Sequence, residues 1–137
     1  MQNLAHIAIA VKSIEKALPF YTDLLGIPLK YTEIIPSEAI KAAFLQLGEV
    51  SIELMEPINA TSTIQRFIDK RGEGIHHIAF EVAKLEKQLT KLSEAGVRLV
   101  DKQPRPGASG SQVAFIHPSA ANGVLLELCQ HNHTTGN

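Results

Sequence analysis

The chain has 137 residues, of which 45% are hydrophobic and 20% charged, and its formal net charge is −1. This length and balance are typical of one soluble globular domain with a sizeable core. The small net charge argues against a nucleic-acid surface, no apolar run reaches membrane-spanning length, and a single cysteine, Cys129, excludes an internal disulfide framework. Because the N-terminus also has no basic leader pattern, we expect a cytoplasmic protein with neither a membrane nor a nucleic-acid partner.

A first strand is predicted from Leu4 to Val11, with bulky residues on one face. Its other face carries His6 between small residues, as expected for a strand that lines a cavity. Ser13 is expected to cap a helix that runs to Leu25. Pro19 lies inside this helix and predicts a kink or a late start.

Three strands are predicted next, over residues 27–35, 40–47 and 50–55. On the second of these strands, alternate side chains should face opposite sides. Ala43, Leu45 and Leu47 are expected to face the helices, and Ala42, Phe44 and Gln46 the cavity. On the third strand, Glu53 is expected to face the cavity. A connection over residues 57–74 follows, with a short helix that Thr61 or Ser62 caps.

The second half of the chain predicts the same order of elements. A strand at 75–82 bears His77, a helix covers 84–95, and further strands cover 97–100, 112–116 and 124–130. Glu127 lies on the last strand, and residues 104–110 form a loop rich in Pro, Gly and Ser. Residues 131–137 are expected to be a polar tail.

Two short motifs recur between these halves. His6-Ile7-Ala8 matches His77-Ile78-Ala79 at an offset of 77 − 6 = 71 residues. The segment 50–54 (VSIEL) matches 124–128 (VLLEL) at an offset of 127 − 53 = 74 residues. A supersecondary unit used twice explains this spacing. We therefore divide the single domain 1–137 into a module at 4–56, a linker helix at 57–74, a module at 75–130 and the tail.

The repeat gives each module a histidine on its first strand and a glutamate on its last. Alone, each of these residues is more often a satisfied core or surface residue than a ligand. Packing does not explain why both modules place His and Glu on the cavity side. Two imidazoles and two carboxylates suit a divalent ion of the Co, Mn, Ni or Zn type, and the two carboxylates balance its charge. The candidate metal ligands are His6, Glu53, His77 and Glu127.

Several stretches resemble the vicinal oxygen chelate (glyoxalase/bleomycin-resistance) superfamily, and within it the methylmalonyl-CoA epimerase branch. The resemblance covers residues 4–130 and rests on His6–Val11, Pro19-Phe20-Tyr21 with Leu25-Gly26, Glu53–Pro57, Gly72–Phe80, Phe115–Pro118 and Gly123–Leu128. It implies an α+β fold in which two βαβββ modules form a curved mixed sheet with a central metal-binding cavity. It also implies that the four candidate residues are the metal ligands and that the assembly is a homodimer.

The implied activity is epimerisation of the (R) and (S) forms of methylmalonyl-CoA, a small acyl-CoA substrate. An α-proton is removed and returned through a metal-stabilised enolate, and Glu127 is the candidate base. Backbone N–H groups of Gly110, Ser111 and Gln112 are candidates for binding the substrate carboxylate. Several epimerases have an acid/base Glu where this chain has Ala42, so the second acid/base group is open.

Other activities remain compatible with the sequence. Glu53 stands where some epimerases have Gln, which is closer to a glyoxalase I (lactoylglutathione lyase) type isomerase. A metal-free binding protein of the same fold is a third alternative, although such members usually lose the ligands. An extradiol dioxygenase fits less well, since that family is usually longer. Lys102 and Arg105 are better explained as solvated charges than as contacts to CoA phosphates.

Overall fold

The computed structural model describes residues 3–131 and contains strands and short helices. The strands are β1 (Asn3–Ala10), β2 (Leu29–Ile35), β3 (Ile40–Leu47), β4 (Val50–Pro57), β5 (Gly74–Glu81), β6 (Arg105–Pro106), β7 (Gln112–Ile116) and β8 (Leu126–Gln130). The α-helices are α1 (Ile14–Pro19), α2 (Thr63–Arg71) and α3 (Leu85–Glu94), with a π-helical segment η1 (Phe20–Leu24) and 3-10 turns η2 (Pro36–Glu38), η3 (Ala108–Gly110) and η4 (Pro118–Ala120). In this part of the chain, none of the helices has the length and apolar character needed to cross a membrane.

The chain divides into two compact units. Residues 6–76 form the first, called here the N-terminal unit, and residues 3–5 with 77–131 are the described part of the second, the C-terminal unit. The module boundaries and the single domain expected from the sequence remain predictions. Of the expected polar tail, only His131 lies among the described residues.

Both units combine parallel and antiparallel strand pairs. In the N-terminal unit the strand order is β2-β3-β4-β1, with antiparallel β2–β3 and β3–β4 pairs and a parallel β1–β4 pair. In the C-terminal unit the order is β5-β8-β7-β6, with a parallel β5–β8 pair and antiparallel β8–β7 and β7–β6 pairs. In each unit the last long strand thus runs beside the first. The predicted α+β class with mixed pairing is confirmed.

Helix α1 begins where the sequence predicts. The Ser13 side chain accepts a hydrogen bond from the backbone N–H of Lys16, which satisfies one donor of the first turn. Ile14 then packs against one face of β3 and β4, where Ala43 and Leu45 are fully buried. Leu47, predicted to lie on this covered face, is 53% exposed because it is the last residue of β3, beyond the residues packed against α1.

Pro19 interrupts the helix without ending it. Proline has no N–H to donate to the preceding turn, and the chain changes there from α1 to η1, where the Leu25 N–H bonds to the carbonyl of Phe20, five residues back. The predicted interruption at Pro19 is therefore confirmed, as a change of helix type. The alternative of a late start is wrong, since α1 begins directly after its cap.

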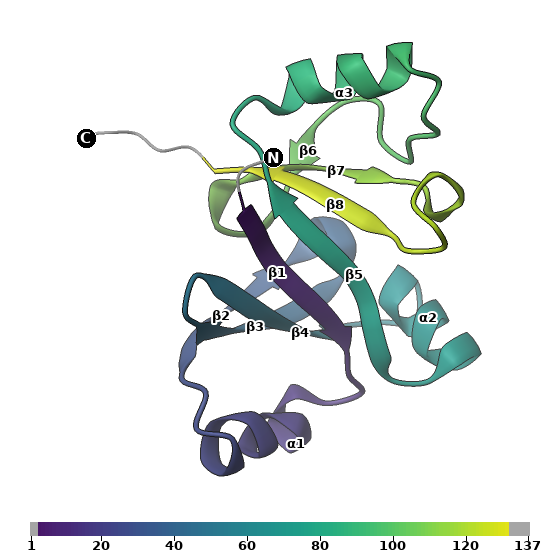
Figure 1. Ribbon diagram of the computed structural model, residues 1–137. Coiled ribbons are helices and arrows are strands. Elements are labelled where there is room, and N and C mark those ends of the chain that lie inside the picture. Colours follow the sequence, from purple (N-terminus) through teal and green to yellow (C-terminus); the bar gives the residue numbers. More distant parts are fainter. Residues whose placement is uncertain (1–2, 132–137) are drawn as a thin grey trace. The chain divides into compact units, whose positions relative to one another are not determined.

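The C-terminal unit packs α3 on one face of β7 and β8 (Figure 1). Leu85 and Leu89 of the helix are buried against Ala114 and Leu128. The strand predicted at 97–100 is wrong, because Leu99 makes only an isolated bridge to Ile116. The short strand β6 instead pairs with the outer edge of β7.

A side chain from the last strand of each unit caps the N-terminus of that unit's helix α1 or α3. In the N-terminal unit the Glu56 carboxylate accepts a hydrogen bond from the N–H of Ile14, the first residue of α1, at 2.7 Å. In the C-terminal unit the Gln130 side-chain carbonyl accepts one from the N–H of Leu85, the first residue of α3, also at 2.7 Å. Since 130 − 56 = 74, these acceptors are related by the same offset as the repeated glutamates. Each therefore ties the last strand of a unit to its first helix.

Candidate active site

The N-terminal unit brings His6 and Glu53 together. His6 lies on β1 and Glu53 on the parallel neighbour β4, and the imidazole Nε2 is 3.2 Å from a carboxylate oxygen of Glu53. Both side chains are largely buried, Glu53 more completely than His6. Phe44, the cross-strand partner of Glu53 on β3, presents its ring edge-on to His6, with centroids 6.3 Å apart. A buried carboxylate beside an imidazole nitrogen can hold a proton or a cation.

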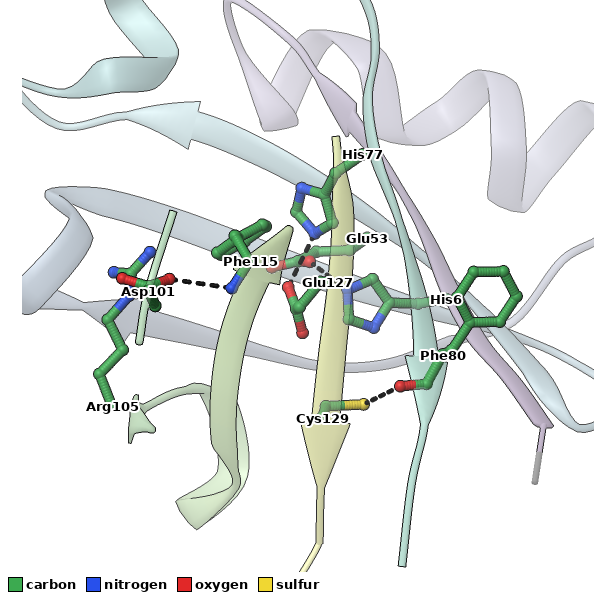
Figure 2. A network of polar contacts seen from close by, with 9 residues as sticks. All are labelled: His6, Glu53, His77, Phe80, Asp101, Arg105, Phe115, Glu127 and Cys129. Atoms are coloured by element: carbon green, nitrogen blue, oxygen red, sulfur yellow. Dashed lines mark hydrogen bonds and ion pairs between the residues drawn. The ribbon is translucent and has the colours of Figure 1, made fainter. Parts of the chain in front are cut away.

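The C-terminal unit repeats this arrangement. His77 on β5 places its Nε2 2.9 Å from a carboxylate oxygen of Glu127 on β8, and both side chains are buried (Figure 2). Phe115 on β7 is the cross-strand partner of Glu127 and lies edge-on to His77, with ring centroids 5.1 Å apart. The sequence motifs thus correspond to a repeated group of His, Glu and Phe.

The two phenylalanines were given no role in the sequence interpretation. Phe44 was assigned to the cavity side and Phe115 belonged to a family motif, yet 115 − 44 = 71 is the offset that relates the two histidines. Their ring edges restrict the tilt of each imidazole, since aromatic rings favour edge-to-face contacts. Aligning the two halves at this offset would have identified them.

Phe115 also connects the C-terminal group to a charged pair. The guanidinium of Arg105 lies 5.3 Å from the Phe115 ring centroid, and its Nε is 3.3 Å from a carboxylate oxygen of Asp101. The same carboxylate oxygen accepts a hydrogen bond from the Phe115 backbone N–H at 2.9 Å (Figure 2). Arg105 is therefore held in place by Asp101 and Phe115. The sequence had suggested instead that its charge is solvated.

The other histidines among residues 3–131 have local roles. His76 lies edge-on to Phe67 of α2. The Nδ1 of His117 accepts a hydrogen bond from the Ser119 N–H at the start of η4, so His117 stabilises this turn. His131, the first residue of the expected polar tail, places its Nδ1 3.6 Å from a carboxylate oxygen of Glu81.

The predicted carboxylate-binding loop is a tight turn. The N–H of Ser111 donates to the carbonyl of Ala108 within η3, and Ser111 is buried. This backbone donor is thus used inside the loop, while the roles proposed for Gly110 and Gln112 remain predictions. Nearby, a Cβ added at Gly107 would lie 2.6 Å from a methyl group of Val113.

Ala42 has no acid/base capacity and is fully buried. On β3 it lies opposite Glu33 of β2 on one side and opposite Met55 of β4 on the other. Directly opposed residues in antiparallel strands project from the same face of the sheet. Glu33 is therefore the carboxylate at the strand position nearest to Ala42, and this proximity follows from strand register, which the sequence pattern does not specify.

Comparison with known proteins defines the class. A sequence profile of the Glyoxalase/Bleomycin resistance protein/Dioxygenase superfamily matches residues 5–115. A Bacillus subtilis protein named "Uncharacterized protein YqjC" is 45% identical over 96% of this chain and 98% of its own. The Ethylmalonyl-CoA/methylmalonyl-CoA epimerase of Cereibacter sphaeroides is 37% identical over 93% of this chain and 97% of its own. A solved structure of methylmalonyl-CoA epimerase in complex with methylmalonyl-CoA and NH4+ has a TM-score of 0.92 at 30% identity, over 96% of each chain.

The chain therefore belongs to the vicinal oxygen chelate superfamily, in agreement with the motifs that suggested it. Its similarity over nearly the full length of epimerases places it among enzymes, in the isomerase class. The two buried His–Glu pairs suit a divalent metal ion in ligand type and charge.

Proposed function

We propose that the protein is a metal-dependent epimerase that interconverts (R)- and (S)-methylmalonyl-CoA. The observation that carries this proposal is the repeated buried His–Glu pair in a chain that resembles such epimerases over most of its length. The proposed metal ligands are His6, Glu53, His77 and Glu127. The ion is of the Co, Mn, Ni or Zn type, because imidazole and carboxylate donors suit these metals.

The residues present fit such an ion. Each pair turns a ring nitrogen and a carboxylate oxygen toward one another, so two donor atoms are already oriented in each unit. Burial of Glu53 and Glu127 is costly unless a positive charge accompanies them. When bound, a divalent ion supplies electrostatic stabilisation of the negative charge that develops on the thioester oxygen as the α-proton leaves.

Glu127 is the proposed base. Its carboxylate is paired with His77, whose ring lies edge-on to Phe115, and Glu127 is buried, so the carboxylate is positioned and largely shielded from water. A carboxylate in such surroundings can accept the α-proton, made acidic by the neighbouring thioester. Backbone N–H groups of Gly110, Ser111 and Gln112 remain the proposed contacts to the substrate carboxylate. Because the Ser111 N–H already bonds to the Ala108 carbonyl, it can contribute only if this turn opens.

The test is a chiral assay of the purified protein loaded with Co²⁺. Pure (S)-methylmalonyl-CoA should convert to an equal mixture of epimers, and His77→Ala should lose conversion by about 100-fold or more, as expected for loss of a first ligand. His131→Ala, which alters a histidine paired with Glu81, is the matched control and should retain activity. No conversion by the metal-loaded wild type would contradict the proposal.

A glyoxalase I type isomerase is the second candidate, because Glu53 is a buried carboxylate at a position where some epimerases have Gln. The same preparation should then isomerise the hemithioacetal of methylglyoxal and glutathione. Turnover of that substrate with no change in the CoA ester would favour this candidate.

A further inference from the structure

Inversion at a carbon atom needs a proton to leave from one face and to return on the other. One carboxylate therefore does not readily perform both steps, and a second acid/base group is required. Glu127 in the C-terminal unit is the proposed first group. The N-terminal unit carries its own set of side chains on the face that bears His6 and Glu53.

Strand register identifies that set. The residues that share this face in the N-terminal unit are His6, Ala8 and Ala10 of β1, Tyr31, Glu33 and Ile35 of β2, Ile40, Ala42, Phe44 and Gln46 of β3, and Ser51, Glu53, Met55 and Pro57 of β4. Beyond the His6–Glu53 pair, this set contains two titratable side chains, Tyr31 and Glu33. The ring of Tyr31 stacks on Phe44 with centroids 4.7 Å apart, which shows that β2 projects its odd-numbered residues toward the site face.

Glu33 follows Tyr31 by two residues and therefore shares its face. Burial agrees with this, because Tyr31 and Glu33 are half-buried while Thr32 and Ile34, between and after them, are exposed. A strand residue directly opposite another in an antiparallel pair has its Cα about 5 Å away, so Glu33 lies beside Ala42.

Two cross-strand rows define the distance to the metal ligand. Glu53 shares one row with Phe44 and Tyr31, and the next row on the same face contains Met55, Ala42 and Glu33. Such rows are separated by about 7 Å, two residues along a strand. Glu33 therefore lies one row along this face from Glu53, and its side chain is half-buried while its row neighbours Ala42 and Met55 are buried.

We propose that Glu33 is a second catalytic acid/base residue, which exchanges a proton with the α-carbon on the face opposite to the one that Glu127 serves. This inference rests on the proposed epimerase function. As one carboxylate takes the α-proton, the electron pair of the C–H bond moves onto the thioester oxygen. The other, as a carboxylic acid, then gives its proton to the same carbon and becomes a carboxylate, and both return to their starting forms by proton exchange with water.

A structural role is the competing explanation. β2 lies at one end of the strand order in its unit, and an inward-pointing charge on an edge strand discourages pairing with other chains. In that case Glu33→Gln would lower solubility or stability and would reduce all steps of the reaction in proportion.

The experiment uses the full metal-loaded chain in heavy water, with each epimer of methylmalonyl-CoA supplied separately. Glu33→Gln should lower inversion by about 100-fold while one epimer, the one whose proton faces Glu127, still gains deuterium without inverting. Glu33→Asp, which keeps the carboxylate, should retain inversion within about tenfold of the wild type. Glu49→Gln, an exposed carboxylate in the β3–β4 turn, is the control.

Several results would overturn the inference. One is inversion by Glu33→Gln at the wild-type rate, and another is an equal loss of deuterium exchange for both epimers in that variant. A third is an equal defect in Glu33→Gln and Glu33→Asp. A fourth is a loss of activity in Glu33→Gln that follows its metal content or its melting temperature. If the wild type neither exchanges nor inverts the substrate, the proposed function fails instead, so the two failures are distinguishable.

Discussion

At the scale of single residues, Phe115 contacts both the proposed metal ligand His77 and the guanidinium of Arg105. Replacing Phe115 by Leu removes the flat ring from both. We expect Phe115→Leu to weaken Co²⁺ binding by about tenfold, the lower end of what altered surroundings of a ligand usually cost. Titration with Co²⁺, monitored by its absorption spectrum, measures this affinity. Phe20→Leu, at an exposed position, is the control, and unchanged affinity in Phe115→Leu would refute the positioning role.

Gly107 is required for space rather than for its backbone freedom. Its φ of −123° is open to any residue, but an added Cβ would lie 2.6 Å from a Val113 methyl group and 2.8 Å from the Ser111 hydroxyl. We expect Gly107→Ala to lower the free energy of unfolding by about 1–3 kcal/mol, as overpacking usually does. Urea unfolding measures this loss. Gln103→Ala, at an exposed position before β6, should change stability little, and equal effects of the two substitutions would be inconsistent with a steric cause.

At the scale of elements, each unit ties its last strand to its first helix through one side-chain acceptor. Glu56→Ala removes the acceptor for the Ile14 N–H and leaves a helix N-terminal donor without its charged partner. We expect a loss of about 2 kcal/mol in the free energy of unfolding, and a smaller loss for Glu56→Gln, which keeps an acceptor oxygen. Denaturant unfolding with Glu49→Ala as an exposed control provides the measurement. A Glu56→Ala variant as stable as the control would show that the bond contributes nothing.

Element prediction succeeded where periodicity and caps agreed. The predicted bounds of β3 and β7 match the structure, and Ser13 and Ser62 cap the helices α1 and α2. The predicted strand at 97–100 failed because its apolar pattern does not specify a partner. There the N–H groups of Val100 and Asp101 both donate to the Phe115 carbonyl, and the Asp101 carboxylate takes the Phe115 N–H. A side chain thus occupies a donor that a continuous strand would have used.

At the scale of the whole molecule, the repeat made the candidate site predictable. Both His–Glu pairs could be inferred because the same types of residue recur on strands of matching parity. The Glu56 and Gln130 caps and the position of Glu33 beside Ala42 could not be inferred, since they depend on strand register. Register is set by pairing across the sheet, which local pattern does not specify.

Metal binding should also stabilise the folded chain. A ligand that binds only the folded state adds about 2.7 kcal/mol when present at 100 times its dissociation constant, which corresponds to a rise of several degrees in melting temperature. Chelator treatment should therefore lower the melting temperature, and Co²⁺ should restore it. His77→Ala should lose this response while His131→Ala keeps it. An equal response from both variants would point to adventitious binding.

The His–Glu pairs are proposed to support proton exchange at the carbon next to a thioester. The most direct measurement is deuterium uptake at the α-carbon of methylmalonyl-CoA in heavy water, followed by mass spectrometry. The metal-loaded wild type should introduce one deuterium per molecule, and both His77→Ala and Glu127→Gln should slow this uptake by about 100-fold or more. Absence of uptake by the metal-loaded wild type, or uptake by His77→Ala and Glu127→Gln at the wild-type rate, would contradict this prediction.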